Sequence, residues 1–253
     1  MLYISTRMNI LDRLATLSSA QVSLSQADVH IWSANQDAPI YPMEQLWQTL
    51  SNDEQQRATR FHFERDRRRF IVGRGLLRAI LGRYAHIEAA QVRFVYGQRG
   101  KPALAEVYGG ETLKFNVSHS NGHILCAITN LREIGVDIEH VHVISEADAI
   151  AERFFSTQEN EVYRQLPAEE KLTAFFNCWT RKEAYIKATG DGLSRPLDQF
   201  SVSFVPGEPA RMVDCYDIPE EVHRWSFYAL HPAPGYIAAL CVEGQNCHLT
   251  SWP

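Results

Sequence analysis

The pattern of hydrophobic and polar positions predicts strands and helices in both halves of this chain. Strand patterns, in which apolar and polar residues alternate or short apolar runs occur, return along most of its length. We expect strands over residues 28–34, 92–96, 113–117, 123–129, 134–139, 200–205, 225–230 and 236–242. Helical composition covers residues 51–84 and 145–190, with a break near Pro167. The pattern therefore predicts a protein of the α/β (α+β) class.

Two local signals refine these elements. Residues 51–54 (Ser-Asn-Asp-Glu) combine a helix N-cap with acidic residues in the first turn. Gly73 and Gly75 interrupt the helix that follows, which predicts either two helices or a kink. Asn121-Gly122 lies between two apolar runs, which is a strong signal for a hairpin turn.

The order of elements suggests two halves and an extension. Residues 1–26 are weakly patterned, and we expect a loosely attached N-terminal extension. Residues 27–130 would form an N-terminal α/β half, and residues 131–253 a C-terminal α/β half that holds the candidate metal site.

Composition narrows the class of protein. The chain has 253 residues, of which 45% are hydrophobic and 22% charged, and this is ordinary for a globular protein. A net charge of −5 argues against general binding of nucleic acid. No apolar run approaches the roughly 18 residues of a membrane span, and Asp12 and Arg13 interrupt any secretory signal. Five cysteines without a Cys-x-x-Cys pair favour a reduced, cytoplasmic protein.

The first candidate site lies on the strand over residues 134–139. Alternation puts Gly135, Asp137 and Glu139 on one face and the apolar residues on the other. Two carboxylates this close repel unless a cation lies between them, and Mg²⁺ accepts carboxylate oxygens. We expect the glycine to leave open space beside them. The alternative is the solvent-facing side of an ordinary strand.

The second candidate lies on the helix over residues 179–187. At about 100° per residue, Glu183 falls within an apolar stripe, and Lys187 lies one turn later at its edge. The stripe consists of Leu172, Phe175, Phe176, Trp179 and Ile186. An acid on a buried face is unfavourable unless something compensates it. Glu183 could therefore join Asp137 and Glu139 in a magnesium site, with Lys187 facing phosphate oxygens; the alternative is an ordinary Glu–Lys pair.

The third candidate is a segment rich in arginine. Nine arginines lie between residues 57 and 83 against two acids, a local balance of +7. They are Arg57, Arg60, Arg65, Arg67, Arg68, Arg69, Arg74, Arg78 and Arg83. Such segregation suggests a polyanionic ligand, whereas the alternative is a solvated helix face.

The fourth candidate is Ser118-His119-Ser120 at the hairpin end. These side chains could bind phosphate oxygens or stabilise the turn. A Ser–His nucleophile is disfavoured, because adjacent residues of a strand point to opposite faces.

Six motifs together resemble those of the 4′-phosphopantetheinyl transferase superfamily, most closely its monomeric class that activates surfactin synthetase. They occur in the order of that family, within residues 28–242. The motifs are Gly100-Lys101-Pro102, Phe115-Asn116-Val117-Ser118-His119-Ser120, Ile134-Gly135-Val136-Asp137-Ile138-Glu139, Arg153-Phe154-Phe155-Ser156, Trp179-Thr180-Arg181-Lys182-Glu183-Ala184-Tyr185-Ile186-Lys187 and Gly190-Asp191-Gly192-Leu193. Residues 1–26 have no counterpart in that pattern.

The resemblance implies an activity and a fold. Coenzyme A would donate its 4′-phosphopantetheine arm to a serine of an apo acyl or peptidyl carrier protein, with release of 3′,5′-ADP. Two similar α/β subdomains, related by a pseudo-twofold arrangement, would hold coenzyme A between them. The implied protein is a cytoplasmic monomer that depends on Mg²⁺, or on Mn²⁺ in its place.

The resemblance also implies roles for individual residues. Asp137, Glu139 and Glu183 would hold the metal, and Glu183 would serve as the base for the attacking serine. Lys187 would neutralise charge on the pyrophosphate. The remaining contacts to coenzyme A would come from Ser118, His119, Lys101, Arg57 and Arg69.

Two positions depart from the pattern, and two other functions stay open. Phe70 stands where a threonine or another small polar residue can occur, and Glu54 stands where a close relative has a basic residue. A magnesium-dependent nuclease could use the same acids, although the 46 residues from Asp137 to Glu183 fit a compact nuclease poorly. A nucleic-acid-binding module could use the arginine segment, but it leaves Glu183 without a purpose.

Overall fold

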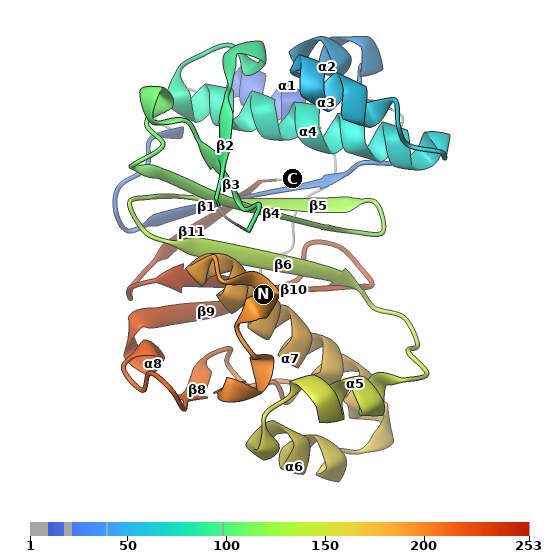
Figure 1. Cartoon of the computed structure of the whole chain (residues 1–253), viewed down its shortest axis with the longest axis vertical. Coiled ribbons are helices and arrows are strands. Elements are labelled where there is room, and N and C mark those ends of the chain that lie inside the picture. The colour runs from blue at the N-terminus through green and yellow to red at the C-terminus, as the bar shows by residue number, and fades with distance from the viewer. Residues whose placement is uncertain (1–9, 18–21, 39, 98, 253) are drawn as a thin grey trace.

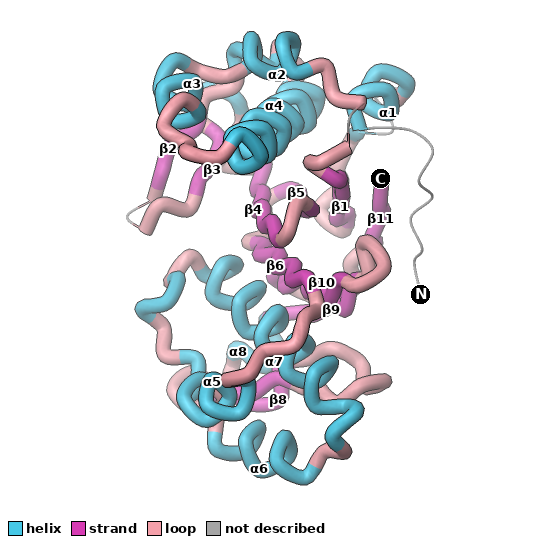
Figure 2. Tube along the Cα trace, turned by 90° about the vertical axis from the view of Figure 1, so that its right-hand side faces the viewer, coloured by secondary structure: helices cyan, strands magenta, loops and turns pink. Residues whose placement is uncertain are grey.

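Two β-sheets pack against each other at the centre of the molecule, and helices cover their outer faces (Figures 1 and 2). The computed structural model describes residues 10–17, 22–38, 40–97 and 99–252. The α+β class expected from the sequence is confirmed. None of the helices in these ranges has the length and apolar composition needed to cross a membrane.

The first sheet has four strands in the order β11-β1-β5-β4, and the second has three in the order β6-β10-β9. All neighbours are antiparallel except β11, which runs parallel to β1. The strands are β1 (Asp28–Asn35), β4 (Leu113–Ser120), β5 (His123–Asn130), β6 (Ile134–His140), β9 (Trp225–Leu230), β10 (Tyr236–Glu243) and β11 (His248–Trp252). Two small pairs accompany them, β2 (Phe94–Tyr96) with β3 (Pro102–Leu104), and β7 (Phe200–Val202) with β8 (Met212–Cys215).

Each sheet carries a long helix of 22 residues on its outer face (Figure 2). On the side of the first sheet lie α1 (Ile10–Thr16), α2 (Met43–Thr49), α3 (Asn52–Ala58) and the long α4 (Glu64–Ala85). On the side of the second sheet lie α5 (Ala147–Phe154), α6 (Thr157–Gln165), the long α7 (Ala168–Thr189) and the short α8 (Glu221–Arg224). Short 3-10 helices cover Ala89–Gln91, Glu106–Tyr108, Gly192–Ser194 and Leu197–Gln199.

The strand alternation produces three hydrophobic layers. On β1, Trp32 belongs to the layer beneath α4, whereas Ile31 belongs to the layer between the two sheets. On β6, Val136 and Ile138 also enter the layer between the sheets, as the sequence pattern predicted. The third layer lies between the second sheet and α5–α7. The opposite face of β6 is therefore left to contact α7.

The helix boundaries differ from the expectation in one respect. The helical region after Ser51 does form two helices, and Ser51 starts the first with a capping box to Glu54. The break, however, falls at residues 59–63, and α4 runs unbroken through Gly73 and Gly75. A Cβ at Gly75 would lie 2.7 Å from Leu46 Cδ2, so this glycine allows close packing of α2.

Residues 10–17 and strand β11 both pack into the first half of the fold, which the sequence did not predict. Ile10, Leu14 and Leu17 are buried beneath α4, so a loose attachment is wrong for this part of residues 1–26. Residues 1–9 and 18–21 lie outside the described residues. Strand β11 belongs to the first sheet, although the sequence assigned it to the second half, and Trp252 stacks on Trp32 with ring centroids 4.6 Å apart.

Gly135 allows α7 to lie directly against β6. A Cβ built at this position would overlap the carbonyl oxygen of Ala184 and the amide nitrogen of Ala188. The expectation that this glycine leaves open space is therefore wrong, because the backbone of α7 fills that space.

Gly135→Ala should lower the free energy of unfolding by about 3 kcal/mol or more, because the added methyl group would force α7 away from β6. Urea unfolding followed by circular dichroism would measure this loss. Gly97→Ala is the matched control, since a Cβ there would meet only the Lys101 carbonyl oxygen, at 3.8 Å. Equal stability of the Gly135 variant and the unchanged protein would contradict the close contact described here.

Candidate active site

Strand β6 presents Asp137 and Glu139 toward α7, on the face opposite its apolar residues. Asp137 is buried, with 3% of its surface exposed, whereas Glu139 is partly buried. The reading of this face as an ordinary solvent-facing surface is therefore wrong for Asp137. Two carboxylates at the boundary between the two halves need positive charge or hydrogen-bond donors close by.

Helix α7 supplies Glu183 and Lys187, one turn apart. Lys187 Nζ donates to Asp137 Oδ1 at 2.5 Å and to Ser118 Oγ at 3.0 Å. The stripe assigned to a buried face includes Trp179, which is only partly buried, and Glu183 and Lys187 are also only partly buried. Because the other sides of α7 pack against β6, β10 and the third hydrophobic layer, Glu183 lies on a more accessible side of the helix than expected.

Strand β4 joins β6 through side chains, since the two strands belong to different sheets. Ser118 Oγ donates to Asp137 Oδ1 at 2.9 Å, and Ser120 Oγ donates to Glu139 Oε2 at 2.8 Å. Asn116 Oδ1 accepts a hydrogen bond from the amide of Val136 at 2.9 Å. The hydroxyls of the first sheet therefore orient both carboxylates of the second.

His119 lies on the opposite side of β4 from its serine neighbours and is exposed. This arrangement agrees with the argument against a Ser–His nucleophile. Partial desolvation, and then the charge of Lys187, lower the pKa of His119, and Arg57 lowers it further. His119 therefore lies close to two cationic residues of the site, Lys187 and Arg57.

The three carboxylates of the site influence one another. Burial raises the pKa of Asp137 in spite of Lys187 and Ser118. Burial is also the main cause of the raised pKa of Glu183, and the charges of Asp137 and Glu139 add to it. Glu139 likewise has a raised pKa, from burial first and then from Asp137. Each carboxylate therefore gains from additional positive charge.

A buried oxygen of Asp137 shows where such charge would fit. Asp137 Oδ2 is buried and has no hydrogen-bond partner. A divalent cation would satisfy this oxygen, so the donor set fits a hard metal ion in its chemistry. Within residues 10–17, 22–38, 40–97 and 99–252, however, no three His, Cys, Asp or Glu side chains are already grouped as a metal site.

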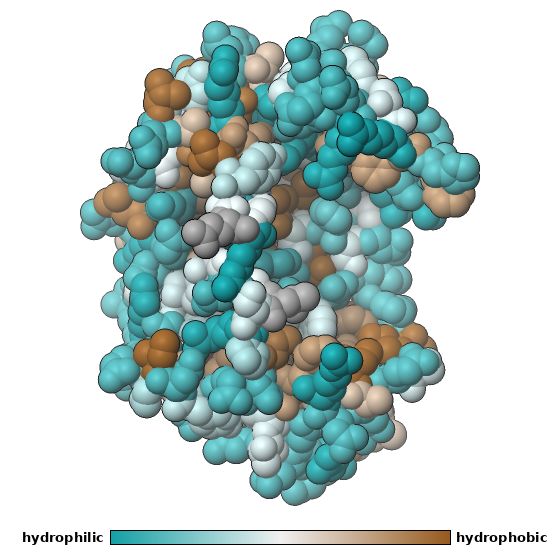
Figure 3. All heavy atoms as spheres, in the orientation of Figure 1, coloured by the Kyte–Doolittle hydropathy of each residue, from teal (hydrophilic) through white to brown (hydrophobic). Residues whose placement is uncertain are grey.

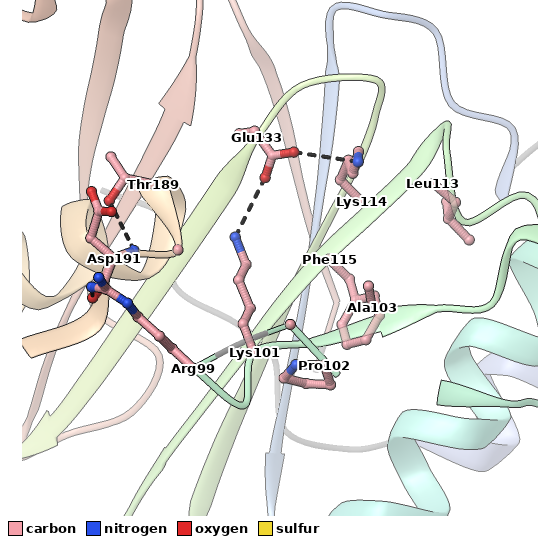
Figure 4. A pocket seen from close by; sticks show the side chains of 12 residues that line it. Arg99, Lys101, Pro102, Ala103, Leu113, Lys114, Phe115, Glu133, Thr189 and Asp191 are labelled. Carbon is pink, nitrogen blue, oxygen red and sulfur yellow. Dashed lines mark hydrogen bonds and ion pairs between the residues drawn. The ribbon is translucent and has the colours of Figure 1, made fainter. Parts of the chain in front are cut away.

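Lys101 occupies a second part of the boundary, in a pocket of about 450 Å³ between the β2–β3 hairpin and the end of α7. Lys101 Nζ donates to Ala188 O at 3.0 Å and lies 3.4 Å from Glu133 Oε2. Figure 4 shows Lys101 and Lys114 directed toward the two oxygens of Glu133, and Arg99 directed toward Asp191. Lys101 therefore connects the two halves as well as contributing positive charge.

Most of the arginine segment is bound to protein groups. Glu54 is buried between two arginines, with Arg74 Nε at 2.8 Å and Arg78 Nε at 2.6 Å. This pairing gives the departure at position 54 a structural purpose. Arg69 makes a two-point contact with Asp37. Arg57 stacks on Phe70 at 5.2 Å and has no carboxylate partner among the described residues.

The sequence analysis did not predict that two cationic residues of α7 are buried. Arg181 donates to the carbonyl oxygen of Ser203, and Lys182 pairs with Glu159 at 2.7 Å. Both lie beside Glu183 in the chain but on buried sides of the helix. The helical spacing offered a signal, because Lys182 falls in line with the apolar Ala174, Cys178 and Tyr185.

Comparisons with known proteins agree with the motifs. A family model described as the 4′-phosphopantetheinyl transferase superfamily matches residues 133–241, and one described as 4′-phosphopantetheinyl transferase, N-terminal, matches residues 32–130. A 4′-phosphopantetheinyl transferase of Nostoc sp., HetI, is 42% identical over 231 residues, which cover 91% of this chain and 94% of the relative. The transferase Sfp of Bacillus subtilis is 30% identical over 198 residues, covering 78% and 84%.

A solved holo-(acyl-carrier-protein) synthase from Thermotoga maritima also matches, with 19% identity and a TM-score of 0.33 over 45% of this chain and 63% of that one. This likeness is too weak to add to the assignment. The family models match both halves of the chain, and the alignment with HetI covers nearly the full length of both proteins. These matches confirm the resemblance found in the motifs. The chain belongs to the 4′-phosphopantetheinyl transferase superfamily and is an enzyme of the Sfp-like type.

Proposed function

We propose that this enzyme transfers the 4′-phosphopantetheine arm of coenzyme A to a serine of an apo carrier protein, in a reaction that requires Mg²⁺ and releases 3′,5′-ADP. The observation that carries this proposal is the contact of Lys187 with Asp137 and Ser118, beside two further carboxylates. Cationic clamps next to carboxylates that can hold a metal suit phosphoryl transfer, which needs positioning and charge stabilisation.

The bonds exchanged define what the protein groups must do. The carrier serine oxygen attacks the β-phosphorus of coenzyme A, and the bond from that phosphorus to the oxygen of the nucleotide phosphate breaks. Glu183 takes the serine proton, directly or through water, because it is the carboxylate of α7 that lies beside Asp137 and Lys187. Lys187 stabilises the charge that develops on the pyrophosphate, and Ser118 keeps Lys187 oriented.

Asp137, Glu139 and Glu183 would hold the metal ion, either Mg²⁺ or Mn²⁺. When bound, the ion would supply positive charge to the pyrophosphate oxygens. The unpartnered Asp137 Oδ2 supports this assignment. Ser120 supports it as well, because its bond to Glu139 Oε2 fixes the orientation of that carboxylate.

The nucleotide end of coenzyme A would lie toward the cationic residues of the first half. Arg57 and His119 would face the 3′-phosphate, and Lys101 would contribute charge from the β2–β3 hairpin. Arg57 suits this role because it has no carboxylate partner among the described residues. Arg69 could take part only by exchanging Asp37 for phosphate.

The carrier protein would approach over the segment between β6 and α5 and over the helices to about residue 170. Hydrophobic surface is visible over that segment in Figure 3, and Val143 within it is 86% exposed. The carriers of fatty-acid, polyketide and nonribosomal-peptide synthesis all remain candidates. We further propose that the protein is cytoplasmic, because its five cysteines include no Cys-x-x-Cys pair, and that it is a monomer, because two parts of one chain already form the site.

Asp137→Ala and Glu183→Gln should each reduce arm transfer at least about 100-fold, because they remove a metal ligand and the proposed base. Mass spectrometry of an apo carrier incubated with coenzyme A and Mg²⁺ measures the transfer. Glu220→Gln, which changes an exposed acid outside the site and outside the proposed carrier surface, is the control and should retain activity. Full activity in either site variant would refute its assignment, and a panel of carriers left at their original mass by the unchanged enzyme would refute the transfer itself.

Arg57→Gln should raise the KM for coenzyme A about 10- to 100-fold while leaving the KM for 3′-dephospho-coenzyme A nearly unchanged, since a charged hydrogen bond to the 3′-phosphate is lost. Steady-state kinetics with both donors would separate these effects. Arg60→Gln, an exposed arginine in the same segment, is the matched control. A similar loss with both donors would place Arg57 elsewhere.

A further inference from the structure

Lys182 immediately precedes Glu183 on α7, yet its side chain is directed into the protein. Its exposed fraction is 0%, and it lies in line with the buried Ala174, Cys178 and Tyr185. Glu183 and Lys187, by contrast, are partly exposed. Helix α7 therefore carries one pair of charged residues at the active site, Glu183 and Lys187, and two buried cations, Arg181 and Lys182, on its other sides.

The ammonium group of Lys182 has a complete set of partners. Lys182 Nζ lies 2.7 Å from Glu159 Oε2, and it donates to the carbonyl oxygens of Leu197 and Phe200, both at 2.6 Å. A lysine ammonium has three protons, so these three acceptors use all of them. The group also lies 4.3 Å from the centre of the Phe200 ring. No donor remains for a phosphate oxygen.

Both carboxylate oxygens of Glu159 also accept hydrogen bonds, and these bonds connect further elements of the fold. Its Oε2 also accepts the amide of Ser156 at 2.7 Å, and its Oε1 accepts the amide of Val202 at 2.7 Å. Ser156 is the N-cap of α6, and its hydroxyl accepts the amide of Glu159 at 3.1 Å. The pair therefore ties α7 to the start of α6, to the 3-10 helix Leu197–Gln199 and to β7.

A buried ion pair of this kind resists rearrangement, because moving either partner leaves an unpaired charge in the interior. Rotation of α7 about its axis would carry Lys182 away from all three acceptors at once. The same rotation would turn Glu183 and Lys187 relative to Asp137 on β6. Small displacements of reacting groups reduce rates strongly, so a fixed rotation matters for catalysis.

We propose that the Lys182–Glu159 pair positions the active site by setting the rotation of α7, and that Lys182 itself does not touch substrate. This inference rests on the catalytic roles proposed for Glu183 and Lys187. Lys182 and Glu159 are positioning residues, and neither takes part in proton or phosphoryl transfer.

The test uses Lys182→Met, Glu159→Gln and the double variant of the full chain. The single variants should melt at lower temperature than the double variant, because each leaves one buried charge unpaired. The double variant should bind coenzyme A, measured by titration calorimetry, within about twofold of the unchanged enzyme, while kcat falls about tenfold or more. Kinetics are measured at a temperature at which every variant is folded.

Arg211→Met is the control, since Arg211 is an exposed cation of the same half that lies outside the site and outside the proposed carrier surface; it should leave kcat unchanged. An unchanged kcat in the folded double variant would overturn the inference. So would weaker binding of coenzyme A in Lys182→Met with normal binding in Glu159→Gln, because Lys182 would then contact the substrate.

Two further measurements keep the outcome decisive. If the double variant does not fold, Glu159→Asp provides the same comparison, because it keeps both charges and shortens the carboxylate arm. Arm transfer by the unchanged enzyme, and its loss in the Asp137 and Glu183 variants, tests the proposed function separately. A failed positioning test would therefore leave those results intact.

Discussion

The site depends on the direct contact between the backbones of β6 and α7. Gly135 has no side chain, so α7 approaches until the carbonyl oxygen of Ala184 occupies the place of a Cβ. This contact brings Lys187 to 2.5 Å from Asp137 and places Glu183 near the same carboxylate. It also removes water, which is why burial is the first cause of the raised pKa values of the site carboxylates. The same contact between β6 and α7 therefore accounts for both the position of the site residues and the raised pKa values of the carboxylates.

Side chains, not a shared ladder of backbone hydrogen bonds, join the two sheets next to this contact. Ser118 and Ser120 on β4 donate to carboxylates on β6, and Asn116 accepts an amide of that strand. One sheet thus supplies the hydroxyls and the other the acids. The geometry of the candidate site consequently exists only when both parts of the chain are packed together. Lys101 adds a further connection by binding the last turn of α7.

The net charge of a sequence segment does not show which of its cationic side chains can bind a ligand. The arginine segment has a large excess of positive charge, yet Arg74 and Arg78 neutralise the buried Glu54, and Arg69 is bound to Asp37. These arginines stabilise the first half of the fold. Lys182, within the motif that carries the site, is likewise committed to the interior. Only the ion pairs of the folded protein distinguish a structural cation from one that is available to a ligand.

The sequence by itself determined the family, six of the seven strands in the two large sheets, and the regions of the two long helices, but not β11, α1 or α2. Strand alternation placed Val136 and Ile138 on a buried face, Asn-Gly marked the β4–β5 turn, and the motifs pointed to the transferase superfamily. These signals are local, so they can be read from neighbouring positions. The tertiary structure alone decided that Gly135 faces a helix backbone, that Glu183 lies on an accessible side of α7, and that Glu54 is buried between arginines. Those properties depend on which segments, distant in the sequence, pack against each other. Local periodicity shows which face of an element is buried, but not which segment buries it.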